Sequence, residues 1–291
     1  MWNNQKHFFM KNLYHYTSVE TLYNMLEKSI VVDWDTQEHI QYLKMRATHI
    51  EYLNDETERK IFIDTLKRKV HECAYVHKTS LVKEQIEKLE KLCRFNTYII
   101  SLSALKDDLN MWRGYGGNGV GVNLEFDFMK IARFYETVKS SYKMEFQYQP
   151  LKCNYIQPEK CEVEDALVRR IYNYLFNKED DNEKFEDIIL NKAIQDVAIL
   201  FKHSAYESEE EWRFICSSTH IPNHIISNGI IKPYIEFEIP LDAITSITSI
   251  TIGPCIKDDY KIKSIVEFVN KKFIFRKDKI EVKFSNIPYR Y

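Results

Sequence analysis

Glycine is nearly absent from this chain except in one short segment. Only seven of the 291 residues are glycine, and five of them fall between Gly114 and Gly121. Because glycine tolerates left-handed backbone and close approach of other atoms, the segment must have unusual conformational or packing demands. It lacks the Gly-Lys-Ser/Thr ending of a phosphate-binding loop, and it leads into a predicted strand, whereas a dinucleotide fingerprint leads into a helix. We therefore expect the backbone here to pass close to a ligand.

Strand and helix patterns are interleaved irregularly along the rest of the chain. Strand patterns cover residues 13–17, 97–103, 119–126, 153–156, 209–217, 234–239, 247–252 and 280–284. Helical patterns follow a predicted capping box at Thr17–Glu20 and a second start at Asn54–Glu56, and cover 81–93, 164–177, 184–205 and 257–271. Regular βαβ units are missing, so we predict one mixed α+β domain over 1–291, with helical insertions at about 55–93 and 162–205.

Composition excludes several classes of protein. The chain has 41 Lys and Arg against 43 Asp and Glu, a formal charge of −2, so no overall basic field attracts nucleic acid or anionic lipid. No apolar stretch approaches the roughly 20 residues that span a bilayer, and no signal-peptide pattern opens the chain. The six cysteines form no C-x-x-C pair and no zinc-ligand spacing. We expect reduced thiols and a cytoplasmic protein that does not bind membranes.

Carboxylates in the segment Tyr206–Arg213 could carry chemistry. In a strand starting at residue 209, the side chains of Glu209, Glu211 and Arg213 would share one face. Such a Glu-x-Glu could hold a substrate hydroxyl and stabilise an oxocarbenium-like centre, with the arginine keeping both carboxylates ionised. The alternative is a solvated charged face on an edge strand.

Two further segments contain candidate ligand-binding side chains. His15, at the end of a short strand, could hold a ligand hydroxyl or act as a base; alternatively it is a buried histidine bonded to backbone. The rings of Tyr16, Trp112 and Tyr115 could sandwich a planar heterocycle, or could simply pack in the core.

Taken together, these segments resemble a bacterial family called domain of unknown function 2971. The resemblance rests on LYHYTS from Leu13, LND-x-x-E from Leu53, the SLS and MW-x2-Y patterns within Ser101–Tyr115, G-x-G-V-x-L-x-F from Gly119, Glu-x-Glu-Trp-Arg at 209–213 and ITIGP at 250–254. It covers nearly the whole chain in order. The chain has LNDET where the family often has LNDP, which affects only a turn.

LYHYTS and the helix after it also resemble the first strand of the ADP-ribosyltransferase superfamily, which includes PARP-like and DarT-like enzymes. This resemblance implies a mixed sheet of that superfamily's type and NAD as substrate. It implies that His15 holds an NAD ribose hydroxyl, that Tyr115 or Trp112 stacks on nicotinamide, and that Glu211 holds the nicotinamide-ribose 2′-hydroxyl. Glu209 is then the companion of Glu211, although Glu207 and Glu210 compete for the carboxylate role. The NAD-contacting set is completed by Tyr16, Thr17 and Arg213.

We therefore expect an NAD-dependent ADP-ribosyltransferase acting on protein, RNA or DNA, as a toxin or anti-phage effector with an antitoxin protein as partner. Breaking the nicotinamide–ribose bond leaves positive charge on the ribose, which a neighbouring carboxylate stabilises. The alternatives are an NAD glycohydrolase and a non-catalytic module that binds a nucleotide or partner in the same cleft. A basic patch for a nucleic-acid acceptor, or else a solvated helix face, is formed by Arg59, Lys60, Lys67, Arg68 and Lys69.

Overall fold

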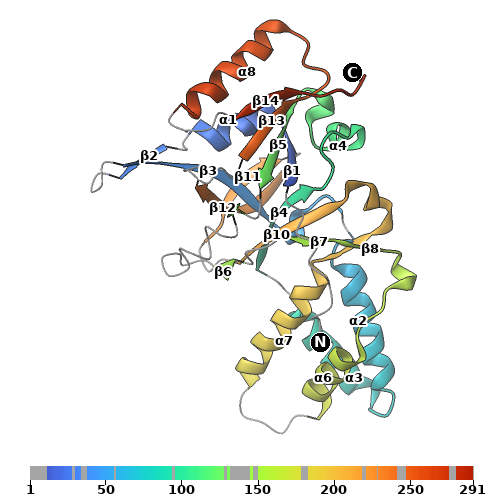
Figure 1. The fold of residues 1–291 in the computed structure, drawn as a ribbon. Coiled ribbons are helices and arrows are strands. Elements are labelled where there is room, and N and C mark those ends of the chain that lie inside the picture. Colours follow the sequence, from blue (N-terminus) through green and yellow to red (C-terminus); the bar gives the residue numbers. More distant parts are fainter. Residues whose placement is uncertain are drawn as a thin grey trace. The chain divides into compact units, whose positions relative to one another are not determined.

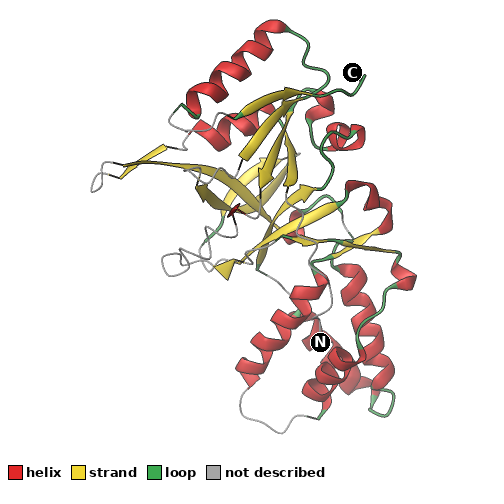
Figure 2. Ribbon diagram, in the orientation of Figure 1, coloured by secondary structure: helices red, strands yellow, loops and turns green. Residues whose placement is uncertain are grey.

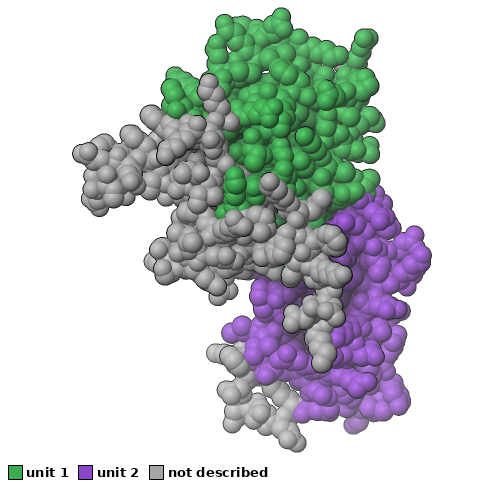
Figure 3. Space-filling model, in the orientation of Figure 1, with its two compact units in different colours: residues 1–48, 98–151, 208–291 green, residues 49–97, 152–207 purple. Residues whose placement is uncertain are grey.

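The computed structural model describes residues 12–27, 30–33, 38–55, 57–93, 96–127, 130–131, 145–146, 150–177, 183–217, 221–227, 229–240, 247–274 and 280–290. The chain forms two compact units, coloured separately in Figure 3. Unit 1 comprises residues 1–48, 98–151 and 208–291, and unit 2 comprises residues 49–97 and 152–207. Both predicted helical insertions, 55–93 and 162–205, fall within unit 2.

A large mixed sheet dominates unit 1 (Figures 1 and 2). Its main path runs β11 (Asn223–Ser227), β12 (Ile230–Pro240), β3 (Glu38–His49), β4 (Thr97–Ser103), β1 (Asn12–Thr17), β5 (Val122–Asp127), β13 (Ile247–Ile252) and β14 (Glu281–Phe284). Strand β10 (Glu211–Ser217) also pairs with β4, and the short strands are β2 (Ile30–Asp33), β6 (Glu145–Phe146) and β7 (Leu151–Lys152). The β1–β4, β1–β5, β5–β13, β3–β12 and β11–β12 pairs are antiparallel, whereas β13 and β14 are parallel.

Helices α1 (Val19–Glu27) and α8 (Asp259–Lys272) lie next to each other in unit 1 (Figure 1), where the ring of Tyr23 is 5.6 Å from that of Phe268. Apolar residues four apart on each helix, such as Leu22 and Leu26, form the stripe that enters the sheet's core. The cap of α1 is Ser18, whose hydroxyl accepts the Thr21 amide at 3.0 Å. The predicted cap at Thr17 is therefore wrong by one residue, because Thr17 still pairs within the sheet.

Unit 2 is mainly helical. It contains α2 (Lys60–Cys73), α3 (Thr79–Leu92), α6 (Asp165–Phe176), α7 (Glu183–Ala198), the 3-10 turns η1 (Ile50–Tyr52) and η3 (Pro158–Lys160), and the parallel strands β8 (Asn154–Ile156) and β9 (Phe201–His203). The helices share one apolar core that includes Phe62, Leu66, Leu89, Ile171 and Ile194.

Two predicted helix boundaries in unit 2 are wrong. Helix α2 begins at Lys60, well after Asn54, because the Asp55 carboxylate accepts the Thr57 amide at 2.8 Å and closes a turn before the helix. The helix predicted over 184–205 ends at Ala198, and the chain then enters β9.

The mixed α+β class is confirmed, whereas an ADP-ribosyltransferase-type sheet stays a prediction. Among the described residues, no helix has the length and apolar character needed to span a membrane.

Candidate functional site

Strands β1 and β4 separate inside the sheet of unit 1. Their ladder has one registered pair, Tyr14 opposite Ser103. Next to it the His15 ring reaches across to β4, with Nδ1 3.1 Å from the carbonyl oxygen of Ser101. Ser101 is exposed, although the other six residues of β4 are buried. The sheet is therefore open at this point, and His15 lies at the opening.

The contact with Ser101 determines how His15 is protonated. A carbonyl oxygen can only accept, so Nδ1 carries a proton and donates it. Desolvation by burial lowers the pKa of His15 below its usual 6.5, against the opposing effect of the Ser101 hydrogen bond. The ring is thus neutral at pH 7, and no described residue is hydrogen-bonded to Nε2. Nε2 can accept a hydrogen bond from a ligand hydroxyl.

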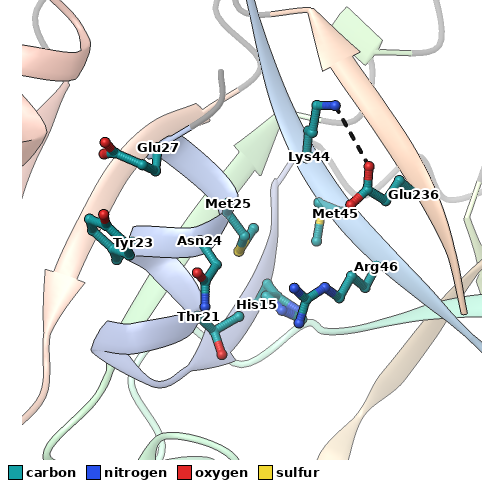
Figure 4. Close-up of a pocket in the computed structure, with 10 residues that line it drawn as sticks. All are labelled: His15, Thr21, Tyr23, Asn24, Met25, Glu27, Lys44, Met45, Arg46 and Glu236. Carbon is teal, nitrogen blue, oxygen red and sulfur yellow. Dashed lines mark ion pairs between the residues drawn. The ribbon is translucent and has the colours of Figure 1, made fainter. Parts of the chain in front are cut away.

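His15 lines a cavity of about 430 Å³ (Figure 4). This volume lies in the range of small-molecule sites. The lining comes from β1, α1, β3 and β12, and consists of His15, Thr21, Tyr23, Asn24, Met25, Glu27, Lys44, Met45, Arg46 and Glu236. Within it, Lys44 Nζ lies 3.6 Å from Glu236 Oε2, and the Arg46 side chain extends toward His15 (Figure 4). The cavity lining therefore combines a neutral imidazole with two cations, Lys44 and Arg46, and two carboxylates, Glu27 and Glu236.

The charged lining of this cavity is not among the residues predicted from the sequence. No strand is predicted over residues 38–49, where β3 carries Lys44 and Arg46. Glu236 is 190 residues further along the chain and reaches β3 only through the β3–β12 ladder, in which it pairs with Arg46. Alternating Lys44 and Arg46 in the sequence KMR was the one available local signal.

An aromatic cluster occupies the other face of β1, since successive strand residues point to opposite faces. Tyr14 and Tyr16 pack there with Met111 and Trp112. Trp112 is fully buried and edge-on to Tyr16, with ring centroids 4.9 Å apart, and its Nε1 donates to Asp107 at 2.6 Å. Trp112 thus has the core-packing role that was the alternative to nicotinamide stacking.

Tyr16, like Trp112, is held in place by hydrogen bonds within the protein. Its hydroxyl donates to the Leu105 carbonyl at 2.9 Å and accepts the Asp108 amide at 3.1 Å. Burial raises the pKa of Tyr16 above its usual range. Tyr115 is half-buried beside this cluster, so the structure places its ring with Tyr16 and outside the lining of the His15 cavity.

Glu209 is in direct contact with Tyr115, whose hydroxyl donates to Glu209 Oε1 at 2.7 Å. The predicted strand from residue 209 is wrong at its start, because Glu209 ends the 3-10 turn η4 (Ser204–Glu209). Glu210 has a left-handed φ of 42°, and its carbonyl accepts the Ala104 amide at 3.1 Å. This kink prevents Glu209 from sharing a strand face with Glu211, which begins β10.

Glu211 and Arg213 do share a face of β10, as predicted, and both are buried. Arg213 Nε lies 3.0 Å from Glu211 Oε1 and Nη2 lies 3.1 Å from Oε2, which is the bidentate geometry of strong guanidinium–carboxylate pairs. The alternative of a solvated charged face therefore does not hold. Glu207 and Glu210, the competing carboxylates, are exposed.

The end of β4 connects these groups. Ser101 accepts from His15, and the Ser103 hydroxyl donates to the Glu209 carbonyl at 2.7 Å. Tyr115 is thus hydrogen-bonded directly to Glu209, and both His15 and Glu209 are hydrogen-bonded to residues of β4. The structure does not include Tyr115, Glu209 or Glu211 in the lining of the His15 cavity.

Backbone packing accounts for two key glycines. A Cβ on Gly121 would collide with the carbonyl oxygen of Thr17 and come within 2.7 Å of the Gly116 oxygen. A Cβ on Gly253 would come within 2.9 Å of the Gly121 oxygen, to which the Gly253 amide donates. We expected a ligand to approach the backbone closely at these glycines, but here the close approach is made by other parts of the main chain. Thr17 contributes its carbonyl oxygen to this packing.

A buried carboxylate on β5 was also missed. Glu125 accepts hydrogen bonds from Asn12 at 2.7 Å and from Ser249, and Lys283 Nζ lies 3.5 Å away. Burial acts to raise its pKa, but the Ser249 hydrogen bond and the charges of Lys283 and Lys106 hold the pKa of Glu125 below its usual range. A lone glutamate in the apolar strand NLEF was the only local signal.

The cations that were considered for a basic patch in unit 2 are partly neutralised. Arg59 pairs with Glu51, and Lys67 Nζ lies 2.8 Å from Glu90. These pairs favour the alternative of a solvated helix face for this group of cations.

One comparison, with models of protein families, finds a match. Residues 111–214 match the model of a family described as protein of unknown function (DUF2971), which confirms the resemblance over those residues. The match includes Tyr115 and the Glu209–Arg213 segment, and His15 lies outside it. Searches of curated proteins and of solved structures return no match.

Proposed function

Starting from a chain whose residues 111–214 carry the DUF2971 pattern, we propose that the protein binds NAD in the His15 cavity and transfers ADP-ribose to a macromolecule. The observation that carries the proposal is the opening between β1 and β4, where Nε2 of a neutral histidine can accept from a ligand. A ribose hydroxyl is a donor suited to that atom.

The proposed chemistry needs a carboxylate near the ribose. Cleavage of the nicotinamide–ribose bond develops positive charge on the sugar, and a carboxylate placed there stabilises the transition state more than the ground state. Glu211 is the residue that the superfamily resemblance implies, but Arg213 holds both of its oxygens. Glu209 is half-buried and bonded to Tyr115, so it is the second candidate for the same role.

The central test is incubation of the whole protein with NAD labelled in its adenosine half, together with separate protein, RNA and DNA pools. The wild type should label one pool, and His15→Ala should reduce labelling about 100-fold, the usual loss when a transition-state contact is removed. His224→Ala, at an exposed histidine on β11, is the matched control and should label normally.

The same assay separates the alternatives. Nicotinamide release without labelling identifies an NAD glycohydrolase, and NAD binding without release identifies a non-catalytic module. Either result contradicts the transferase proposal. Normal labelling by His15→Ala contradicts the proposed site.

Glu209→Gln and Glu211→Gln decide between the two carboxylates. One of the two variants lacks the carboxylate that stabilises the charge on the ribose. That variant should lose turnover while its KM for NAD stays near that of the wild type. Full turnover by both variants would contradict a carboxylate role for this segment.

We further propose that the protein acts in the cytoplasm as a toxin or anti-phage effector, held in check by an antitoxin protein. Expression of the wild type should then arrest growth while His15→Ala does not. Equal growth of the two strains, with labelling intact in vitro, would contradict the toxin role alone.

A further inference from the structure

Arg46 supplies a cation to the His15 cavity, and no carboxylate of the described side chains neutralises it. Its guanidinium carbon lies 5.0 Å from the centroid of the Tyr234 ring, and no described acidic side chain forms an ion pair with it. Glu236 is directly opposite Arg46 in the β3–β12 ladder, yet its carboxylate pairs with Lys44 at 3.6 Å. In Figure 4 the Arg46 side chain extends toward His15, and both residues line the cavity.

The other charges among the described lining residues leave this cation in excess. Glu27 lies 2.9 Å from Lys272 Nζ, so its charge is already compensated from α8. Glu236 compensates one of the two cations on β3, and His15 is neutral at pH 7. A cavity with one cation in excess favours an anionic ligand.

We propose that Arg46 and Lys44 form a diphosphate subsite in this cavity, with Arg46 as the main phosphate ligand. The planar guanidinium donates two parallel hydrogen bonds to phosphate oxygens, a geometry that the ammonium of Lys44 cannot match. The inference rests on the proposed function in one respect, since NAD contains a diphosphate. The subsite itself requires only a ligand with two linked phosphates.

Glu236 should lower the affinity of this subsite for a diphosphate. Its carboxylate lies 3.6 Å from Lys44 Nζ, and a bound diphosphate must compete with it for the same ammonium. Removing the Glu236 charge removes one carboxylate that competes with the phosphates for Lys44, and it also removes a repulsion toward the phosphates. Substitutions at Arg46 and Glu236 therefore change diphosphate affinity in opposite directions.

The test is titration calorimetry of the whole chain with inorganic pyrophosphate, ADP and adenosine at low salt. Arg46→Gln should weaken pyrophosphate and ADP about tenfold or more, because a charge-assisted hydrogen bond is lost, and should leave adenosine unchanged. Glu236→Gln should strengthen both phosphate ligands severalfold. Arg290→Gln, at an exposed arginine, is the matched control and should bind as the wild type does.

Several outcomes overturn the subsite. They are no pyrophosphate or ADP binding by the wild type, unchanged affinity in Arg46→Gln, and weakening that extends equally to adenosine. If Arg46→Gln does not fold, Glu236→Gln decides, and unchanged or weaker binding contradicts the inference.

Failure of the subsite and failure of the transferase proposal are distinguishable. Arg46-dependent ADP binding without any transfer from NAD refutes only the transferase. Transfer from NAD with an unchanged KM in Arg46→Gln refutes only the subsite.

Discussion

The two faces of strand β1 differ although they belong to the same six residues. On one face, Tyr14 and Tyr16 pack with Trp112, and the Tyr16 ring lies edge-on to Trp112 while its hydroxyl donates to the Leu105 carbonyl. On the other, His15 opens into a cavity with Lys44 and Arg46. The difference shows that neighbouring residues of one strand can have two tasks: Tyr14 and Tyr16 contribute folding free energy through packing, and His15 is available for a ligand.

The largest expected effect is on the face that carries Tyr14 and Tyr16. Trp112→Ala removes a fully buried indole and its hydrogen bond to Asp107, so it should lower the free energy of unfolding by about 4 kcal/mol. Denaturant titration measures this loss. Tyr75→Ala, at a tyrosine that is 84% exposed, is the control and should change stability little. A small loss for Trp112→Ala would show that this face is not the stabilising one.

The next largest effect on stability is expected at the carboxylates Glu211 and Glu209. Glu211→Gln removes the carboxylate charge that pairs with the buried guanidinium of Arg213 and should cost about 3 kcal/mol in denaturant titration. Glu209→Gln weakens one hydrogen bond of a half-buried group and should cost about 1 kcal/mol. Equal losses would mean that the Arg213 pair is no more important to stability than the Tyr115 contact. The comparison also tells whether lost turnover in Glu211→Gln comes from chemistry or from unfolding.

A smaller effect lies where β1 ends. Gly121→Ala places a methyl group against the Thr17 carbonyl, and relief of that clash should cost about 2 kcal/mol. Gly114→Ala has no atom within 4 Å of the new methyl and should be neutral or stabilise by roughly 0.5 kcal/mol. Thermal unfolding of the pair measures the contrast. Matching melting temperatures would show that the glycine segment does not need its close backbone contact.

The smallest effect is the pH dependence of the face that carries His15. The pKa of folded His15 is below 6.5, so its contribution to stability is complete above pH 6.5. As the pH falls below 6.5 the unfolded state takes up the proton first, and this stability is lost as the pH falls through the folded pKa. The wild type should therefore lose more unfolding free energy than His15→Gln between pH 7.5 and 5. If the unfolding free energies of the wild type and His15→Gln changed in parallel with pH, burial would not lower the pKa of His15.

The sequence was most informative where side-chain pattern and local contacts agree. The apolar, β-branched stretch 247–252 is observed as β13 with the same bounds, and the amphipathic stretch 164–177 as α6 over Asp165–Phe176. The position of Glu209 was not predictable, because it depends on a left-handed Glu210 held by Ala104, about a hundred residues away. The same holds for Arg46, which reaches His15 only through long-range strand pairing.

The bridge from His15 to Ser101 has one further consequence. In that bridge an imidazole replaces the main-chain partner that a neighbouring strand would normally provide. The ring orientation is therefore settled when the sheet forms, before any ligand arrives. A ligand that bonds to Nε2 loses little affinity to freezing a side-chain rotor, which is the usual advantage of a preorganised receptor.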